Sequence, residues 1–193
     1  MNSLTKDLST PPDVAARRLL GSYLTRFIDG QEIVCSIVET EAYDQDEPAS
    51  HSYRGVTPRT EVMFGSAGYA YVYFTYGMHY CLNVVTGSEN HGSAVLIRAL
   101  QPIKGLDIIK ANRQKITSEL MLTNGPGKLC QALAIGREFS GHDLTKSPVI
   151  LTLRPALESK DIKSSPRIGI SQAKNIKWRF YIKDNPYVSR VSS

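Results

Sequence analysis

The chain contains the stretch Tyr69-Ala-Tyr71-Val-Tyr73-Phe-Thr-Tyr76-Gly77, in which tyrosines alternate with other residues. Successive side chains of a strand point to opposite faces, so Tyr69, Tyr71 and Tyr73 are predicted to share one face. Aromatic packing within a half-buried sheet is the commoner use of such a pattern. Tyr76-Gly77 falls where the strand should turn, so we predict a hairpin with Tyr76 exposed at its tip. An exposed ring there suits insertion into a base stack better than it suits solubility.

An acidic segment lies upstream of this hairpin, Ile37-Val-Glu39-Thr-Glu41-Ala-Tyr43. If the segment is a strand, Glu39, Glu41 and Tyr43 share one face. Carboxylates are rarely buried unless they are paired or functional, so two of them on a buried face would indicate a site. A solvent-exposed face of an edge strand explains the pattern equally well. The residue types suit chemistry on a base, because rings stack on nucleobases and a carboxylate can activate water.

The remaining sequence predicts more strands than helices. Asp29-Gly30 separates two strand-like runs and is a strong signal for a tight turn. Strands are expected at 22–28, 32–43, 69–75, 79–86, 94–100, 149–154, 167–171 and 177–183, and helices at 14–20, 104–120 and 129–135. Residues 44–68 are expected to form a polar loop with a short helix near 59–64. The strands do not alternate with helices, which predicts one α+β domain over residues 1–193: a curved, mostly antiparallel sheet flanked by short helices, with a protruding β-hairpin.

Composition limits the class of protein. A chain of 193 residues suffices for one domain with a core, and 41% apolar and 21% charged residues are ordinary for a folded protein. The 23 Lys and Arg against 18 Asp and Glu give a net charge of +5, which suits a polyanionic partner without requiring one. Cys35, Cys81 and Cys130 lack metal or redox spacing and are expected to be reduced and buried. No signal peptide or membrane span is recognisable, so a soluble, intracellular protein is expected.

Three further polar residues stand out, and each has an ordinary explanation. Arg98 ends an apolar strand and could pair with Glu41 or reach water. Asn83 interrupts a strand and must be hydrogen-bonded if it is buried. His51, in the polar loop, could contact a base or lie on the surface. Taken singly, none of the three identifies a site.

Taken together, these residues closely resemble motifs of the alkyladenine (3-methyladenine) DNA glycosylase family. The similar segments run in the same order from about residue 11 to 190. They are Val38-Glu-Thr-Glu41-Ala-Tyr43, Ala49-Ser-His51-Ser, Thr57-Pro-Arg59, Met63-Phe64, Tyr71-Val-Tyr73-Phe-Thr-Tyr76-Gly77-Met78, Asn83, Leu96-Ile-Arg98-Ala-Leu-Gln-Pro102, Gly125-Pro-Gly-Lys128-Leu-Cys-Gln-Ala-Leu-Ala-Ile135, Pro166-Arg-Ile-Gly-Ile170, Trp178-Arg-Phe-Tyr-Ile and Asn185-Pro-Tyr187-Val-Ser. A resemblance of this extent is far more specific than a single short motif.

The resemblance implies roles at the reacting bond. Glu41 corresponds to the general base that activates the water attacking C1′ of a flipped nucleotide, and Arg98 would help to hold that water and the carboxylate. Tyr43 and Tyr73 would sandwich the extruded base. His51 would pack against the base and donate a backbone hydrogen bond to it.

The resemblance also implies how DNA is held. Tyr76 would be the wedge that fills the gap left in the duplex, and Asn83 would crowd the exocyclic amino group of guanine and so discriminate against normal purines. Which basic residues contact phosphate is less defined. The candidates are Arg59, Lys104, Lys110, Arg113 and Lys128.

The implied activity is that of a monofunctional DNA glycosylase in base excision repair. Its substrate would be double-stranded DNA with damaged purines of the 3-methyladenine, 7-methylguanine, hypoxanthine and ethenoadenine class, and its product an intact strand with an abasic site. No lysine matches a Schiff-base nucleophile, and no metal or organic cofactor is implied. The short chain looks like the compact bacterial members, so we expect a cytoplasmic, nucleoid-associated monomer. Residues 44–57 and 154–165 depart from the family pattern, which leaves their DNA contacts open.

Two other functions remain compatible with the residues themselves. Glu39, Glu41, Asp44, Asp46 and Glu47 could ligate Mg²⁺ in a metal-dependent nuclease. The tyrosines could instead be stacking platforms of a non-catalytic module that binds lesions or single-stranded DNA. A nuclease would lose its activity in EDTA, and a binding module would be insensitive to Glu41→Gln.

Overall fold

One long strand, β2 (Gln31–Asp44), organises the β-sheet of this computed structural model, which describes residues 3–189. β2 pairs along most of its length with β5 (Ser93–Lys104), while its first half also pairs with β1 (Tyr23–Ile28) and its second half with β8 (Arg179–Ile182). β6 (Val149–Thr152) continues the sheet beside β1. β4 (His79–Val85) and then β3 (Ala70–Thr75) continue it beside β5, and β7 (Ile162–Ser165) pairs with β8. All these pairings are antiparallel.

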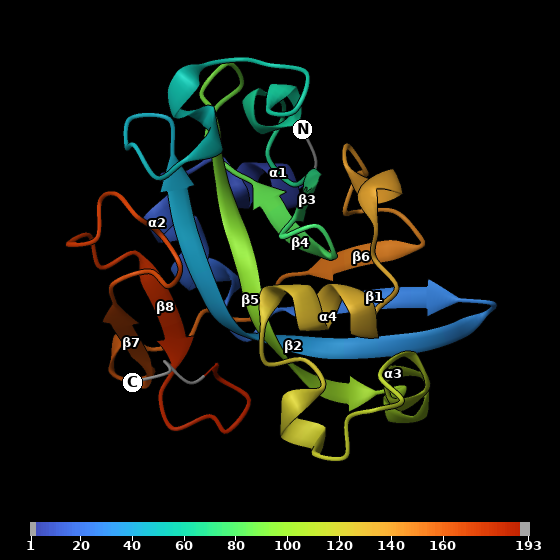
Figure 1. Cartoon of the computed structure of the whole chain (residues 1–193). Coiled ribbons are helices and arrows are strands. Elements are labelled where there is room, and N and C mark those ends of the chain that lie inside the picture. Colours follow the sequence, from blue (N-terminus) through green and yellow to red (C-terminus); the bar gives the residue numbers. More distant parts are fainter. Residues whose placement is uncertain (1–2, 190–193) are drawn as a thin grey trace.

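Strand β2 is bent. Its pairing with β5 changes register at Val34/Cys35, at Ile37/Glu39 and at Glu39/Thr40, and such irregularities bend a strand and increase its twist. β2 therefore runs first beside β1 in a long hairpin, at the right of Figure 1, and then turns upward beside β8. Asp29 and Gly30 at the hairpin tip both have positive φ values, 48° and 77°, as the sequence predicted for a tight turn.

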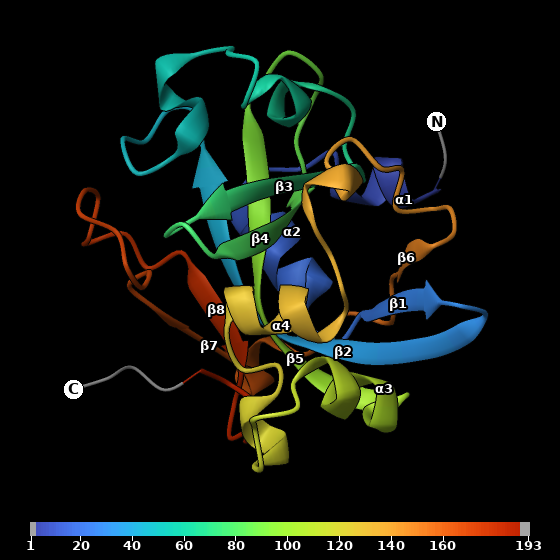
Figure 2. The same cartoon turned by 45° about the vertical axis from the view of Figure 1, so that its right-hand side comes forward.

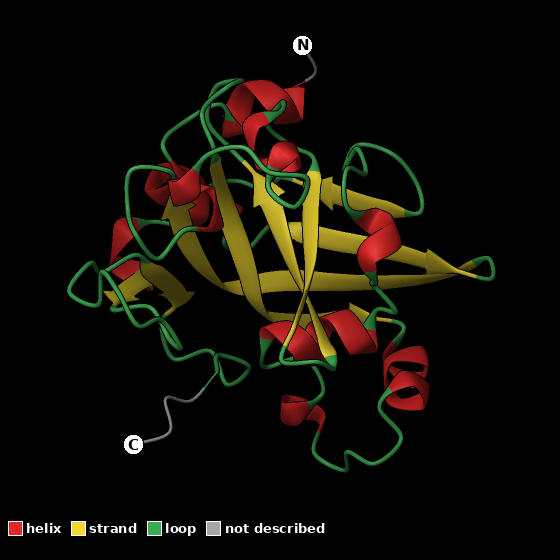
Figure 3. Ribbon diagram, turned by 45° about the horizontal axis from the view of Figure 1, so that its top comes forward, coloured by secondary structure: helices red, strands yellow, loops and turns green. Residues whose placement is uncertain are grey.

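Short helices surround the sheet (Figures 2 and 3). α2 (Pro12–Leu19) follows α1 (Ser3–Leu8) and packs against β2, β5 and β8, whereas α4 (Pro126–Ala132) packs against β4, β5 and α3 (Leu106–Asn112). The other helices are single 3-10 turns: η1 (His51–Arg54), η2 (Glu61–Phe64), η3 (Glu119–Met121), η4 (Arg137–Phe139) and η5 (Ser159–Asp161). Between residues 3 and 189, no helix is long and apolar enough to cross a bilayer. The expected single α+β domain with a curved antiparallel sheet is confirmed.

Two sequence-based element predictions were wrong, and β7 was not predicted. Residues 167–171 form no strand, because the ladder of β7 with β8 ends at Ser165 and the next residue, Pro166, has no N–H to extend it. The helix expected at 104–120 is limited to α3. This helix begins at Leu106, directly after Gly105, whose backbone has a left-handed conformation. α1 was missed. The predicted buried, unpaired cysteines are confirmed at all three positions.

Candidate active site

A cavity of about 320 Å³ opens between the end of β2, the β3–β4 hairpin and the loop that follows β7. The family resemblance pointed to six residues that line it: Tyr43, His51, Tyr73, Tyr76, Asn83 and Arg98. They come from β2, η1, β3, the hairpin turn, β4 and β5, so residues far apart in the sequence meet here. Met63, Tyr71 and Leu96 add apolar surface, and residues 168–171 close one side. The enclosed space suits a flat aromatic group with a few polar contacts.

Glu41 lies directly behind the cavity wall, with 0% of its surface exposed. Its Oε2 accepts a hydrogen bond of 2.8 Å from the Tyr43 phenol, and its Oε1 accepts one of 2.7 Å from the Ile168 N–H. Arg98 Nη1 lies 3.3 Å from the same Oε1. All three of these residues line the cavity. The carboxylate is thus one layer from the cavity, and two hydrogen bonds and an ion pair fix its position.

Glu39 has a different environment, although it shares a face with Glu41 as the sequence predicted. Its Oε1 contacts Arg98 Nε at 3.0 Å, Arg179 Nε at 2.6 Å and the Ser189 hydroxyl at 2.8 Å. Its Oε2 accepts the Ser189 N–H at 2.7 Å. Four donors around one buried carboxylate leave little capacity for another partner. Glu39 therefore serves to hold Arg98, and Glu41 is the carboxylate with a lone pair to spare.

Arg98 links the two carboxylates, and the predicted pairing with Glu41 is present. Burial alone would lower the pKa of the guanidinium, but Glu41 and Glu39 outweigh that effect and raise the pKa. The side chain is almost completely buried, so water screens these charges poorly. Arg98 is a permanent positive charge beside Glu41, at the wall of the cavity.

Packed aromatic side chains form another part of the cavity lining. The Tyr71 and Tyr73 rings lie 5.5 Å apart, and the His51 ring packs edge-on to Tyr73 at 4.6 Å. Tyr69, Tyr71 and Tyr73 belong to one cluster with Met63, as the alternation predicted. Burial raises the pKa of Tyr71 and of Tyr73, so both phenols stay protonated and neutral. The same applies to Tyr43, where the neighbouring Glu41 adds to the effect of burial.

His51 begins η1, which is capped by the Ser50 side chain. Its Nδ1 lies 3.0 Å from the Tyr71 hydroxyl, and its Nε2 lies 3.3 Å from Arg59 Nη2. Part of the residue is open to solvent, yet its ring is enclosed by Tyr71 and Tyr73. Desolvation, assisted by the Arg59 charge, lowers the pKa of His51 to about 4. The imidazole is therefore neutral at neutral pH.

Asn83 is buried in β4, and its amide is hydrogen-bonded as burial requires. Nδ2 donates to the Tyr71 carbonyl at 3.0 Å, which is the residue opposite Asn83 in the β3–β4 ladder. This bond fixes the amide where it lines the cavity. The side chain is thus a fixed polar group in an otherwise aromatic wall.

The β3–β4 hairpin ends in the exposed tip that the sequence predicted. Tyr76 is 81% exposed, and Met78 beside it is also exposed. Tyr76 and Gly77 have φ values of 49° and 67°. A left-handed backbone is uncommon for a bulky residue, so the turn keeps a tyrosine where glycine or asparagine would fit more easily. Such an outlier favours a functional use of the ring.

The basic residues proposed for phosphate contact lie at different places. Arg59 is beside the cavity, with its guanidinium 5.2 Å from the centre of the Tyr73 ring. Lys128 binds the Asn124 side chain at the start of α4. Lys104 and Lys110 form surface ion pairs with Glu32 and Glu119, and Arg113 contacts Gln131. Arg59 is the candidate that the structure brings to the site.

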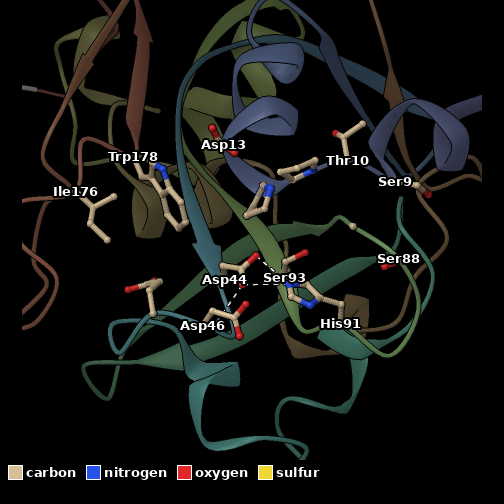
Figure 4. A pocket seen from close by; sticks show the side chains of 14 residues that line it. Ser9, Thr10, Asp13, Asp44, Asp46, Ser88, His91, Ser93, Ile176 and Trp178 are labelled. Atoms are coloured by element: carbon tan, nitrogen blue, oxygen red, sulfur yellow. Dashed lines mark hydrogen bonds and ion pairs between the residues drawn. The ribbon is translucent and has the colours of Figure 1, made fainter.

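A second cavity, of about 650 Å³, lies between the segment before α2, the end of β2 and Trp178 (Figure 4). Donor atoms of Asp44, Asp46 and His91 meet there within 4.8 Å of one another, and His91 Nε2 is 3.0 Å from both Asp44 oxygens. The five acidic residues of the magnesium hypothesis do not converge. Glu39 and Glu41 bind Arg98. Asp44, Asp46 and Glu47 line the second cavity, but both oxygens of Glu47 are bound by Arg167.

Sequence reasoning missed the contribution of the segment after β7. Arg167 is buried against Glu47, and the next residue, Ile168, supplies the N–H that binds Glu41. Arg179 and Ser189, which bind Glu39, were also missed. The only signal in the sequence was an arginine between Pro166 and Ile168 in a segment that reads as a strand.

The fold and the cavity define a class of protein, one whose aromatic cavity can take a flat group beside a buried, hydrogen-bonded carboxylate. A family model described as methylpurine-DNA glycosylase (MPG) matches residues 6–186. A relative from Carboxydothermus hydrogenoformans is 52% identical over 178 residues, covering 92% of this chain and 93% of its own. Relatives from Nitrosospira multiformis and Francisella tularensis are 44% and 45% identical, each covering 98% of this chain and 95% and 100% of their own. All three carry the provisional name 3-methyladenine DNA glycosylase.

The chain belongs to the methylpurine-DNA glycosylase family. It is accordingly a DNA glycosylase of DNA repair, as the resemblance of its motifs implied.

Proposed function

We propose that this protein is a monofunctional glycosylase that extrudes damaged purines from duplex DNA and hydrolyses their N-glycosidic bond with a water activated by Glu41. The observation that carries the proposal is the position of the Glu41 carboxylate, held by two hydrogen bonds and one ion pair from residues that themselves line an aromatic cavity. A stacked base cannot be attacked, so the nucleotide must leave the helix at a cost of a few kcal/mol. Binding of the base between Tyr43 and Tyr73, and of Tyr76 in the gap, offsets that cost.

The carboxylate has two tasks in this mechanism. Breaking the N-glycosidic bond builds positive charge on the sugar, and a nearby carboxylate stabilises it. The spare lone pair of Glu41 accepts a proton from the attacking water, while Arg98, held by Glu39, fixes the carboxylate and the water. The free base leaves, and the strand keeps an intact abasic sugar.

The lining of the cavity supports a preference for damaged purines. Rings of Tyr43, Tyr73 and His51 offer π surfaces that attract a cationic alkylated purine. Asn83 presents a fixed amide that would crowd the exocyclic amino group of guanine. We include 3-methyladenine, 7-methylguanine, hypoxanthine and ethenoadenine in the substrate class. Arg59 beside His51 would contact the DNA backbone, with Lys104 and Lys128 as further phosphate contacts, and the protein would act as a monomer without a metal.

The test is base release in EDTA from a duplex with one hypoxanthine and from alkylated DNA. Wild type should release free base from both and leave an unbroken strand. Glu41→Gln should bind the lesion while losing about 3–5 kcal/mol of transition-state stabilisation, which is a factor of about 150 to 5,000 in rate. Glu158→Gln, which changes a carboxylate of the surface ion pair with Lys160, is the matched control and should behave as wild type. Strand cleavage that appears only with Mg²⁺ would indicate a nuclease, and tight binding without any base release would indicate a lesion-binding module.

A further inference from the structure

Arg167 is a buried arginine whose side chain has 0% exposure. Its Nη1 and Nη2 bind the two oxygens of Glu47 at 2.6 and 2.8 Å, and Nη1 also donates to the Ala42 carbonyl at 2.8 Å. The guanidinium lies 4.6 Å from the centre of the Tyr43 ring and 5.6 Å from that of Trp178. Bidentate bonding combined with stacking fixes its plane, which lysine could not reproduce.

These contacts surround the reacting carboxylate without touching it. Ala42 lies between Glu41 and Tyr43 on β2, and Arg167 holds its carbonyl. Tyr43 and Ile168 donate the hydrogen bonds to Glu41, and Arg167 stacks on the first and precedes the second in the chain. One side chain therefore controls the backbone beside Glu41, the Tyr43 ring and the Ile168 N–H.

The burial of Arg167 shows which face of Tyr43 it covers. Tyr43 lines the cavity of about 320 Å³ that holds the candidate active site, and a guanidinium with no exposed surface cannot lie inside that cavity. Arg167 must cover the ring on its buried side. Glu47 and Trp178 line the second cavity, where Figure 4 labels Trp178 across from Asp44. The ion pair thus lies between Tyr43, which lines one cavity, and the second cavity, which Glu47 lines, and it leaves the cavity side of Tyr43 free for a base.

We propose that the Arg167–Glu47 ion pair positions Tyr43 and the Ile168 amide, and through them the Glu41 carboxylate, for base release. The proposal rests on the proposed function. Displacement of a reacting group by about 1 Å can cost about 100-fold in rate, so a rigid support behind Tyr43 and Ile168 has a direct kinetic effect. A buried ion pair can also be merely structural, and removing one partner then destabilises the fold by leaving a charge unpaired. The two roles differ in what happens when both charges are removed.

The experiment compares Arg167→Met, Arg167→Lys and the double variant Arg167→Met with Glu47→Gln. The double variant leaves no unpaired charge, so its melting temperature should return toward that of wild type. Emission from Trp178, the sole tryptophan, reports whether the packing around residue 167 is kept. Arg26→Met is the matched control, because Arg26 also binds a backbone carbonyl and lies 4.8 Å from an aromatic ring, that of Phe139.

Single-turnover release of hypoxanthine and the Kd for the lesion duplex are measured for each protein. We expect all three Arg167 variants to release base about 100-fold more slowly than wild type, with Kd changed less than about threefold. This includes the double variant, even though its stability is restored. Arg26→Met should keep the wild-type rate. A double variant that recovers both stability and rate overturns the positioning role, although the proposed function stands. Absence of base release by wild type would instead overturn the proposed function and this inference with it.

Discussion

The Tyr43 phenol donates a hydrogen bond of 2.8 Å to Oε2 of Glu41, two residues earlier on the same strand. The other oxygen of Glu41 is bound by Ile168 and Arg98. A ring that can stack on a base is therefore coupled directly to the carboxylate that would activate water. Binding of a base against Tyr43 and orientation of Glu41 become parts of one event.

Tyr43→Phe separates these two tasks, because phenylalanine keeps the stacking ring and removes only the hydroxyl. Loss of a hydrogen bond to a charged group is worth about 1.5–3 kcal/mol, which corresponds to a rate decrease of about 10- to 100-fold. The Kd for a hypoxanthine duplex should hardly change. Single-turnover kinetics and a binding titration check this, and a large loss of affinity at unchanged rate would contradict it.

Tyr76→Ser tests the wedge. Without the ring, extrusion of a paired lesion loses a contribution of up to a few kcal/mol, so base release from a fully paired duplex should slow by about 10- to 100-fold. The same lesion in an unpaired bulge is already partly unstacked and should show a much smaller defect. Met78→Ser changes a neighbouring exposed side chain at the same tip and serves as control. Equal defects on both substrates would argue against a wedge.

Asn83→Ala tests discrimination by comparing hypoxanthine with guanine, which differ only in the 2-amino group. Removing the amide that crowds this group should reduce the ratio of hypoxanthine to guanine release by about tenfold, within the 1–3 kcal/mol typical of such discrimination. Asn112→Ala should leave the ratio unchanged. It removes a partly buried amide that, like Asn83, binds a backbone carbonyl. An unchanged ratio in Asn83→Ala would place the discrimination elsewhere.

His51 predicts a pH dependence of stability. Its pKa in the folded protein is about 4, below the value of 6.5 for an unperturbed histidine. Between these values the unfolded chain binds a proton that the folded protein does not, so the contribution of His51 to stability is complete above pH 6.5 and declines as the pH falls toward 4. The effect is moderated because the residue is partly open to solvent. Melting temperatures of wild type and His51→Gln should therefore diverge as the pH falls through this window, and parallel curves would contradict the assignment.

Much of this architecture follows from local sequence patterns. The period of two in residues 37–43 and 69–75 correctly placed the two carboxylates and the tyrosines on shared faces, and Asp29-Gly30 and Tyr76-Gly77 correctly marked turns. These features depend on neighbours along the chain, which a single sequence displays. The open alternative of an exposed edge face for Glu39 and Glu41 is wrong, because β5 and β8 flank β2 at these residues.

The residues that hold the carboxylates of the site in place could not be predicted in the same way. Arg167-Ile-Gly-Ile170 alternates like a strand, but its backbone and side chain bind Glu41, Glu47 and Ala42, more than a hundred residues away. Similarly, Arg179 gives no local sign that it binds Glu39. Buried charges are satisfied by whatever the fold brings near, so their partners depend on the whole topology. The family resemblance identified the segment without revealing what it does.

The hairpin described above carries Tyr73 in the wall of the cavity and Tyr76 at the exposed tip, with Thr75 paired to His79 across the turn. Under the proposed mechanism, the distance from the base pocket to the gap in the duplex is spanned by the segment from Tyr73 to Tyr76. One added residue would reverse the side to which the ring points, and two would push it about 6–7 Å further out. The length of this turn therefore sets the distance between the base pocket and the wedge. We expect relatives to keep that length without insertions or deletions, whereas the turn at Asp29-Gly30 can change length.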